Sequence, residues 1–291
     1  MSNGQILVVG GDGQIGVGLT EALQRKGVNP LTTTRVQDRV AGRRKFLDLD
    51  LSIDDWPLPH DINVAFLTSA TTSLQACEED PDQSWKINVT SVVRLAERLI
   101  NTGARVVFLS TNQVFDGTLP HQEATATVTP FSAYGRQKAA AEEAILKLGP
   151  ATTVVRLTKV FGAMPTLFVN WLEALKQGEE IKPFSDMVMA PIMLTDVCDL
   201  LCKIGNAHTG GIYQLSAIED ISYADAACHL ANLINADPML VNPVNSVIAG
   251  IPVAVRPSHT SLEVSRVQTE LGWMAPSPFD VIDALMADRG V

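Results

Sequence analysis

A glycine-rich turn between an apolar strand and a helix constrains this chain more than any other feature. The apolar run Gln5–Val9 has the length of a strand and leads directly into a turn at residues 10–16, which reads Gly-Gly-Asp-Gly-Gln-Ile-Gly. The segment Val17–Lys26 then has the apolar spacing of a helix. This context is typical of a dinucleotide-binding turn, in which glycines let the backbone approach a pyrophosphate at the helix N-terminus. The glycine spacing fits two frames: Gly10, Gly13 and Gly16, or Gly11, Gly13 and Gly16.

Strand-like and helix-like segments alternate through the first half of the chain. Four further segments are expected to be strands: Val28–Thr34, Ile62–Thr68, Val106–Ser110 and Thr152–Thr158. Two longer segments have helical spacing: Ser84–Thr102 and Tyr134–Leu148. The alternation predicts an α/β fold of the Rossmann type, a doubly wound parallel sheet with helices on both faces. Ligands bind beyond the carboxyl ends of such strands, so the ends at Thr34-Arg35 and Ser110-Thr111 become candidate sites.

Tyr134 and Lys138 form a pair on the second predicted helix. They are four residues apart, so they share one helical face. A neighbouring ammonium favours a phenolate and is expected to lower the pKa of Tyr134 from its usual value near 10. Tyr134 would then be a proton donor to a carbonyl oxygen near neutral pH. Such a pair also arises by chance in many helices, and its weight comes from the glycine turn that precedes it.

The end of the second predicted strand bears on the choice of cofactor. A fold specific for NAD usually places an acid about 20 residues beyond the glycines, where it binds the ribose 2′-hydroxyl. No acid stands there; the chain instead reads Thr32-Thr33-Thr34-Arg35, and further arginines follow. Because guanidinium groups bind phosphate in a fork, this segment favours NADP(H) over NAD(H). Asp48 and Leu49 follow and could border the adenine.

Composition limits the class of protein. A net charge of −10 argues against a nucleic-acid partner. We expect no membrane span, because no stretch of 18 or more residues lacks polar interruptions. No secretory signal is visible, which favours a cytoplasmic protein. Neither cysteines nor histidines have the spacing of metal ligands, and Cys198 and Cys202 are expected to be free thiols in the core. The sequence leaves the oligomeric state open, a homodimer included.

Several stretches, in order along nearly the whole chain, resemble the extended short-chain dehydrogenase/reductases. Within that superfamily the chain is most similar to the dTDP-4-dehydrorhamnose reductase branch, which includes the related regulatory subunit of methionine adenosyltransferase. The likeness favours the frame of Gly10, Gly13 and Gly16, and it extends to Tyr134 and Lys138. Two further stretches carry it: Ser-Thr-Asn-Gln-Val-Phe-Asp-Gly at 110–117 and Val-Arg-Leu-Thr-Lys-Val-Phe-Gly at 155–162.

The resemblance implies a hydride-transfer reaction and a set of site residues. NADPH would deliver hydride to a ketone carbon while Tyr134 gives a proton to the oxygen, Thr111 holds that oxygen, and Lys138 holds the nicotinamide ribose. The catalytic residues are therefore expected to be Thr111, Tyr134 and Lys138. The expected cofactor-binding residues are Gly10, Gly13, Gln14, Ile15, Gly16, Thr34, Arg35, Asp48, Leu49, Ser69, Ala70 and Lys138. The expected substrate-binding residues are Asn112, Gln113, Lys159 and Arg256.

Three departures from the pattern bear on the substrate. Asn112 and Gln113 replace the usual Asp-Tyr, the usual tyrosine after the third strand is absent, and Lys159 brings a cation where the branch often has tryptophan. These differences leave the reductase chemistry intact but leave the ketone substrate open. A nucleotide-linked keto sugar other than dTDP-4-dehydrorhamnose, or a smaller ketone, would be compatible. Arg256 would meet a substrate pyrophosphate or, equally well, form a structural salt bridge.

Three functions from different classes follow. The favoured one is an NADP(H)-dependent reductase of a keto sugar, and a nucleotide-linked sugar fits best. The others are an epimerase or dehydratase of the same superfamily, and a non-catalytic regulatory subunit that binds the dinucleotide. A dinucleotide-binding domain is expected at residues 1–162 and 191–236, with a smaller substrate-binding lobe at 163–190 and 237–291.

Overall fold

The computed structural model of the chain describes residues 4–207, 209–251 and 256–288. These residues divide into two compact units. The first consists of Met1–Val114, Val128–Leu157 and Leu194–Tyr213, and the second of Phe115–Thr127, Thr158–Met193 and Gln214–Val291. The units differ from the expected boundaries, because residues 115–127, 158–162, 191–193 and 214–236 cluster with the second unit. Gln214 contributes to this, since its side-chain amide donates hydrogen bonds to the carbonyls of Gln122 (2.8 Å) and Glu263 (2.9 Å).

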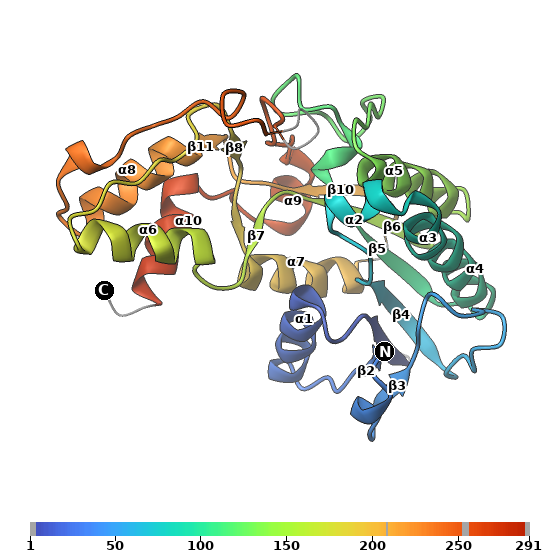
Figure 1. Cartoon of the computed structure of the whole chain (residues 1–291). Helices are drawn as coiled ribbons and strands as arrows, with labels where there is room; N and C mark the ends of the chain where they lie inside the picture. The colour runs from blue at the N-terminus through green and yellow to red at the C-terminus, as the bar shows by residue number, and fades with distance from the viewer. Residues whose placement is uncertain (1–3, 208, 252–255, 289–291) are drawn as a thin grey trace. The chain divides into compact units, whose positions relative to one another are not determined.

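The first unit is built on one seven-stranded sheet (Figure 1). Its strands are β1 (Gln5–Val9), β2 (Leu31–Thr34), β3 (Arg44–Phe46), β4 (Ile62–Leu67), β5 (Arg105–Thr111), β6 (Thr152–Leu157) and β10 (Gly211–Leu215). Their order is β10-β6-β5-β4-β1-β2-β3, and the pairings from β6 through β3 are parallel. This arrangement confirms the Rossmann-type fold. The order reverses between β1 and β4, the place where such folds bind ligands.

Helices cover both faces of this sheet, as its sequence pattern predicts. The main ones are α1 (Gln14–Arg25), α4 (Val92–Asn101), α5 (Ala133–Leu146) and α7 (Leu194–Asn206). Alternate strand residues point to opposite faces, so Leu7 and Phe108 pack in one cluster with α4 and α5. Phe66 faces the other way, against Gly205 of α7. Figure 1 shows α1 beside α7 and α4 beside α5, in agreement with their contacts.

The predicted helix Ser84–Thr102 is more complex than its sequence pattern indicates. It begins earlier as α3 (Pro81–Trp85), passes through a π-helical segment at Lys86–Ser91, and continues as α4. A shorter helix, α2 (Leu74–Glu79), precedes it. Asp80 caps the N-terminus of α3 by accepting a hydrogen bond from the backbone of Gln83. The π-helical segment lies where a buried polar side chain, Asn88, faces α5.

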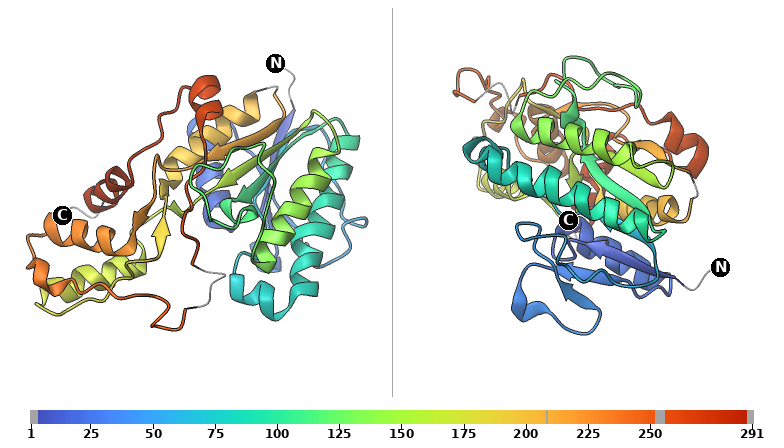
Figure 2. Two further views of the ribbon diagram at one scale, coloured as in Figure 1. Left: turned by 90° about the horizontal axis from the view of Figure 1, so that it is seen from above. Right: turned by 90° about the vertical axis from the view of Figure 1, so that its right-hand side faces the viewer.

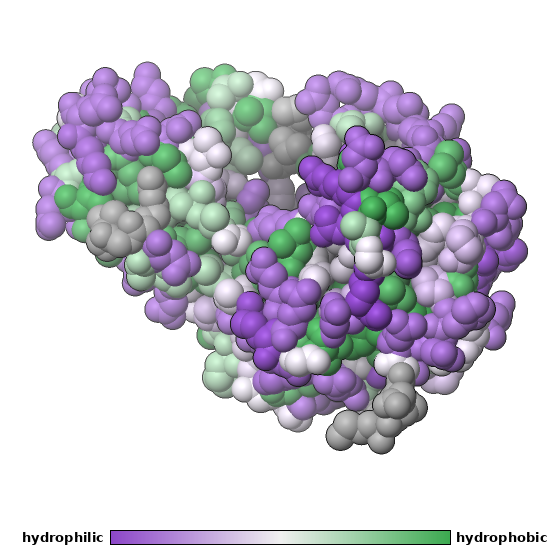
Figure 3. Space-filling view, turned by 90° about the horizontal axis from the view of Figure 1, so that it is seen from below, coloured by the Kyte–Doolittle hydropathy of each residue, from purple (hydrophilic) through white to green (hydrophobic). Residues whose placement is uncertain are grey.

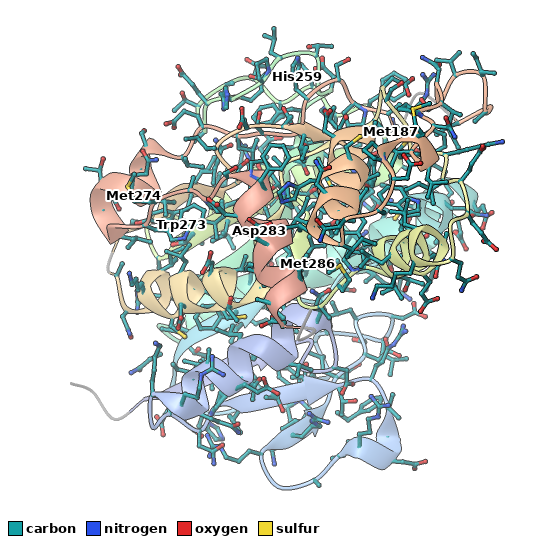
Figure 4. All side chains as sticks on the ribbon, turned by 90° about the vertical axis from the view of Figure 1, so that its left-hand side faces the viewer. Met187, His259, Trp273, Met274, Asp283 and Met286 are labelled. Atoms are coloured by element: carbon teal, nitrogen blue, oxygen red, sulfur yellow. The ribbon has the colours of Figure 1, made fainter. Side chains whose placement is uncertain are left out.

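The second unit has its own hydrophobic core between short strands and helices (Figure 2). Its helices are α6 (Thr166–Lys176), α8 (Tyr223–Leu233), α9 (Ser265–Leu271) and α10 (Pro278–Ala287), and its strands are β7 (Val160–Phe161), β8 (Val188–Met189), β9 (Ile192–Met193) and β11 (Ile221–Ser222). Trp171 of α6, Leu230 of α8 and Ile282 of α10 share this core. Figure 4 labels Asp283 and Met286 on α10; Asp283 pairs with His229 of α8 at 2.6 Å, and Met286 is buried.

Three expectations from composition can be compared with the structure. Cys198 and Cys202 are free and buried, as predicted. None of the described helices is long and apolar enough to cross a membrane, and the described residues contain no cluster of side chains suited to a metal ion. On the face in Figure 3, hydrophobic residues lie among hydrophilic ones rather than in a continuous band.

Candidate active site

The glycine turn is held in a shape that only glycine permits at several positions. Gly10 has a φ of +92°, and a side chain there would collide with Ser69. A side chain at Gly16 would collide with the carbonyl of Gly10, and one at Gly11 would lie 2.9 Å from Cβ of Thr32. Gly13 differs, because a Cβ there would make only an ordinary contact at 3.5 Å. Gly10, Gly11 and Gly16 are therefore required by the packing of the turn, whereas Gly13 is exposed and leaves its backbone accessible.

The start of α1 is suited to bind an anion. Gly13 is its N-cap, no side chain caps the helix, and its first turn carries no acid. The first backbone N–H groups of a helix lack intrahelical partners and bind phosphate well. Gln14, exposed, and Ile15, half-buried, begin this helix. Ser69, just after the end of β4, lies against Gly10, and Ala70 follows it in the chain. These residues fit the pyrophosphate of a dinucleotide.

The end of β2 differs from its sequence-based interpretation, because an acid does stand there. Thr34 is buried at the end of the strand, and its hydroxyl donates a hydrogen bond to Asp12 at 2.5 Å. Asp12 comes from the glycine turn rather than from the segment after β2, which is why the search by sequence spacing missed it. Its Oδ1 atom also lies 3.4 Å from Nη1 of both Arg39 and Arg44.

The other residues near this strand end have distinct environments. Arg35 is exposed, as a group that meets a phosphate must be. Arg43 is held in place, because it donates to the side chain of Gln5 (2.8 Å) and to the carbonyl of Pro30 (3.3 Å). Asp48 accepts a hydrogen bond from the backbone of Asp50 at 3.0 Å. Leu49 is 6% exposed and packs in the hydrophobic core, so only its backbone could border a ligand.

The proposed oxygen-binding residue, Thr111, ends β5 and is buried. Its Oγ1 accepts a hydrogen bond from the backbone of Gln113 at 3.2 Å and lies 3.4 Å from Oδ1 of Asn112. The side chain of Gln113 accepts a hydrogen bond from Ser132 at 3.0 Å. Ser132 is in turn the N-cap of α5, since its hydroxyl accepts from the backbone of Gly135. The segment after β5 is thereby tied to the first turn of α5.

Tyr134 lies in that first turn, where it stays partly exposed. Gly135 allows the close approach, because a side chain there would collide with the carbonyl of Gln113. Burial raises the pKa of the Tyr134 phenol, and the Cys77 thiol acts in the same direction. The expectation of a lowered pKa is thus wrong for the protein's own groups, because burial disfavours the charged phenolate. Tyr134 is a phenol at neutral pH and keeps the proton that a donor needs.

Lys138 is buried one turn further along α5, 2% exposed. Burial lowers its pKa to about 7, while the nearby Glu142 carboxylate acts in the opposite direction. Its Nζ lies 3.8 Å from the centroid of the Phe108 ring on β5, a contact that favours the charged amine. At about pH 7 the Lys138 side chain is therefore divided between its charged and neutral forms.

Behind Lys138 lies a buried ion pair that the sequence analysis did not identify. Glu142 of α5 and Arg156 of β6 are each 3% exposed in their side chains. Arg156 donates from Nε to both carboxylate oxygens at 3.1 Å and from Nη2 to Oε2 at 2.7 Å. In the sequence, Arg156 belongs to the stretch at 155–162 that resembles the family. The spacing between Glu142 and Arg156 in the sequence does not indicate that they pair.

A second buried network joins α5 to the segment after β4. Asn88, in the π-helical segment, donates to the side chain of Gln137 at 2.7 Å and to the carbonyl of Thr71 at 2.9 Å. Its amide oxygen accepts from the backbone of Thr71 at 2.8 Å. π-Helical segments occur often at functional sites, and here the segment aims Asn88 at the loop that begins with Ser69. An asparagine inside an apolar helical pattern is the signal that could have revealed it.

Two of the expected substrate-binding residues lie in the second unit. Lys159 is exposed between β6 and β7, and its carbonyl accepts a hydrogen bond from Ile192 at 2.8 Å. Arg256 is half-buried, and no salt bridge of its side chain is found within the described residues. A backbone hydrogen bond from Ser246 is the main cause that lowers the pKa of Asp186, and the charge of Arg256 adds to it. The structure places Thr111, Tyr134 and Lys138 in the first unit and these two cations in the second.

Comparisons with known proteins identify the family of this chain. The model of the RmlD substrate binding domain family matches residues 4–286. A dTDP-4-dehydrorhamnose reductase of Aggregatibacter actinomycetemcomitans is 26% identical over 280 residues, which cover 92% of this chain and 93% of the relative.

Solved structures show the same fold. A dTDP-4-dehydrorhamnose reductase from Clostridium acetobutylicum is similar with a TM-score of 0.81 and 24% identity, over 99% of this chain and 100% of that one. One from Bacillus anthracis, in complex with NADP, is similar with a TM-score of 0.81 and 20% identity, over 98% and 99%. The family model spans nearly the whole chain, and the resemblance seen in the sequence is confirmed: the protein belongs to the RmlD substrate binding domain family.

Proposed function

We propose that this protein is an NADP(H)-dependent reductase of a nucleotide-linked keto sugar, with Tyr134 as the proton donor. The observation that carries the proposal is the placement of Thr111, Tyr134 and Lys138 in one unit with an uncapped glycine turn. Thr111 ends β5, the other two share one face of α5, and the sheet is of the dinucleotide-binding type. Relatives named dTDP-4-dehydrorhamnose reductase support the reaction class.

The chemistry divides between the cofactor and the protein. NADPH, when bound, supplies the hydride that reduces the carbonyl carbon. Tyr134 donates its phenolic proton to the carbonyl oxygen, so that the ketone becomes an alcohol. Thr111 holds that oxygen by a hydrogen bond. The Lys138 ammonium stabilises the phenolate that remains on Tyr134, which matters because burial raises the pKa of this phenol.

NADP(H) is proposed over NAD(H) because arginines surround the end of β2. Arg35 is exposed, and Arg39 and Arg44 stand nearby. Guanidinium groups bind a 2′-phosphate in a fork. The complex of the Bacillus anthracis relative with NADP is consistent with this choice.

The test is to incubate the protein and NADPH with dTDP-, UDP- and GDP-linked 4-keto sugars, following NADPH absorbance and product mass. We expect NADPH loss with at least one sugar, abolished in Tyr134→Phe. Tyr213→Phe is the matched control, because it also removes one phenolic oxygen, which there contacts Thr209 at 2.8 Å in the sheet. Unchanged turnover in Tyr134→Phe contradicts the mechanism. An altered sugar without NADPH loss indicates an epimerase or dehydratase, and tight NADPH binding without turnover indicates a regulatory subunit.

A further inference from the structure

Asp12 occupies a place in the fold where dinucleotide sites discriminate between their cofactors. In Rossmann folds the end of β2 faces the 2′ position of the adenosine ribose. Asp12 reaches that strand end from the glycine turn, where its hydrogen bond from Thr34 measures 2.5 Å. Its side chain remains 25% exposed, so it is accessible to a ligand.

The contacts of Asp12 differ in strength. Thr34 is 2% exposed, so the hydrogen bond from its buried hydroxyl holds the carboxylate against the end of the strand. Arg39 and Arg44 are 58% and 36% exposed in their side chains and pair with Asp12 at the longer distance of 3.4 Å. Exposed ion pairs are weak, so these arginines can turn toward a ligand while Asp12 stays in place.

A fixed carboxylate at this position affects the two cofactors in opposite ways. A 2′-phosphate carries negative charge, so Asp12 repels it and competes with it for the two arginines. A 2′-hydroxyl is a hydrogen-bond donor, and a carboxylate is a strong acceptor for it. At this strand end the arginines thus favour the 2′-phosphate of NADP(H), whereas Asp12 favours the 2′-hydroxyl of NAD(H).

We propose that Asp12 is a specificity-determining residue that weakens selection of the 2′-phosphate over the 2′-hydroxyl at this site. The proposal deepens the proposed function, because it rests on the dinucleotide site described above. It assigns to the glycine turn a role that such folds usually give to an acid at the end of β2.

Binding of adenine nucleotides tests the proposal without any substrate or turnover. The dissociation constants of 2′,5′-ADP and of 5′-AMP, which differ only in the 2′-phosphate, are measured by isothermal titration calorimetry for the unmodified protein and for Asp12→Asn, Asp12→Ala and Asp38→Asn. Asp38→Asn is the matched control. It removes the same charge from Asp38, an exposed residue in the turn Gln37–Arg39. Thermal melting of each variant verifies that it is folded.

We expect Asp12→Asn and Asp12→Ala to shift the affinity ratio toward 2′,5′-ADP by about tenfold, which corresponds to about 1.4 kcal/mol. The control should leave the ratio unchanged, and the shift should shrink at high salt, because screening weakens the repulsion. If the ratio is unchanged in both Asp12 variants, or shifts toward 5′-AMP because Asp12 orients the arginines, the inference is overturned while the dinucleotide site stands. Binding of neither nucleotide to the unmodified protein overturns the dinucleotide site, and the inference with it.

Discussion

The buried pair of Glu142 and Arg156 makes a sharp prediction about stability. Glu142→Gln removes the negative charge but keeps the size of the side chain. Arg156, 3% exposed, then loses its charged partner across three close contacts of 2.7 to 3.1 Å. Breaking a buried ion pair on one side costs about 3–5 kcal/mol, because the remaining buried charge loses its counter-ion.

This cost is large enough to measure by thermal unfolding. In a domain of this size, a loss of 1 kcal/mol lowers Tm by about 2–4 °C, so Glu142→Gln should lower it by roughly 6–20 °C. Far-UV circular dichroism of purified protein reads the transition. Replacing both partners together by methionine should recover part of the loss, because no charge then remains buried.

The neighbouring residue supplies the control. Glu143→Gln is the same substitution one position along α5, in a pair with Lys147 whose side chains are 70% and 71% exposed. Exposed pairs four residues apart contribute about 0.3–0.5 kcal/mol, so this variant should melt close to the unmodified protein. If Glu142→Gln and Glu143→Gln melt within about 1 °C of each other, the reasoning from burial is refuted.

Two further predictions concern charge. Burial lowers the pKa of Lys138 to about 7 from 10.5, so the unfolded state binds more protons between these values and stability rises with pH across that window. Lys138→Met should therefore raise the free energy of unfolding most at about pH 7 and below, by an amount on the order of a few kcal/mol that fades toward pH 10.5. Urea titrations at several pH values test this, and a gain that does not vary with pH would refute it. Arg35→Ala should weaken NADPH much more than NADH in fluorescence titrations, with Lys45→Ala, another exposed cation of the segment, as the control; equal losses for both cofactors would show that Arg35 does not meet the 2′-phosphate.

Much of the fold could be predicted because its signals are local. The apolar run of β1 was predicted with its observed bounds, and α5 differs from its prediction by one residue at its start and two at its end. Strand β3 was missed because it has three residues with no apolar alternation, Arg-Lys-Phe, and depends on its pairing with β2. The π-helical segment was missed because its hydrophobic spacing is nearly that of an α-helix.

Local patterns in the sequence were enough to predict the glycine turn, the succession of strands and helices, and the pair of Tyr134 and Lys138. Each of these features depends on residues that are close together in the sequence, so the spacing of residue types is sufficient to predict it. Three features became visible only in the folded chain: Asp12 meets Thr34, Glu142 pairs with Arg156, and burial raises the pKa of Tyr134. These features join residues on different elements, and they follow from how the sheet packs its helices and excludes water.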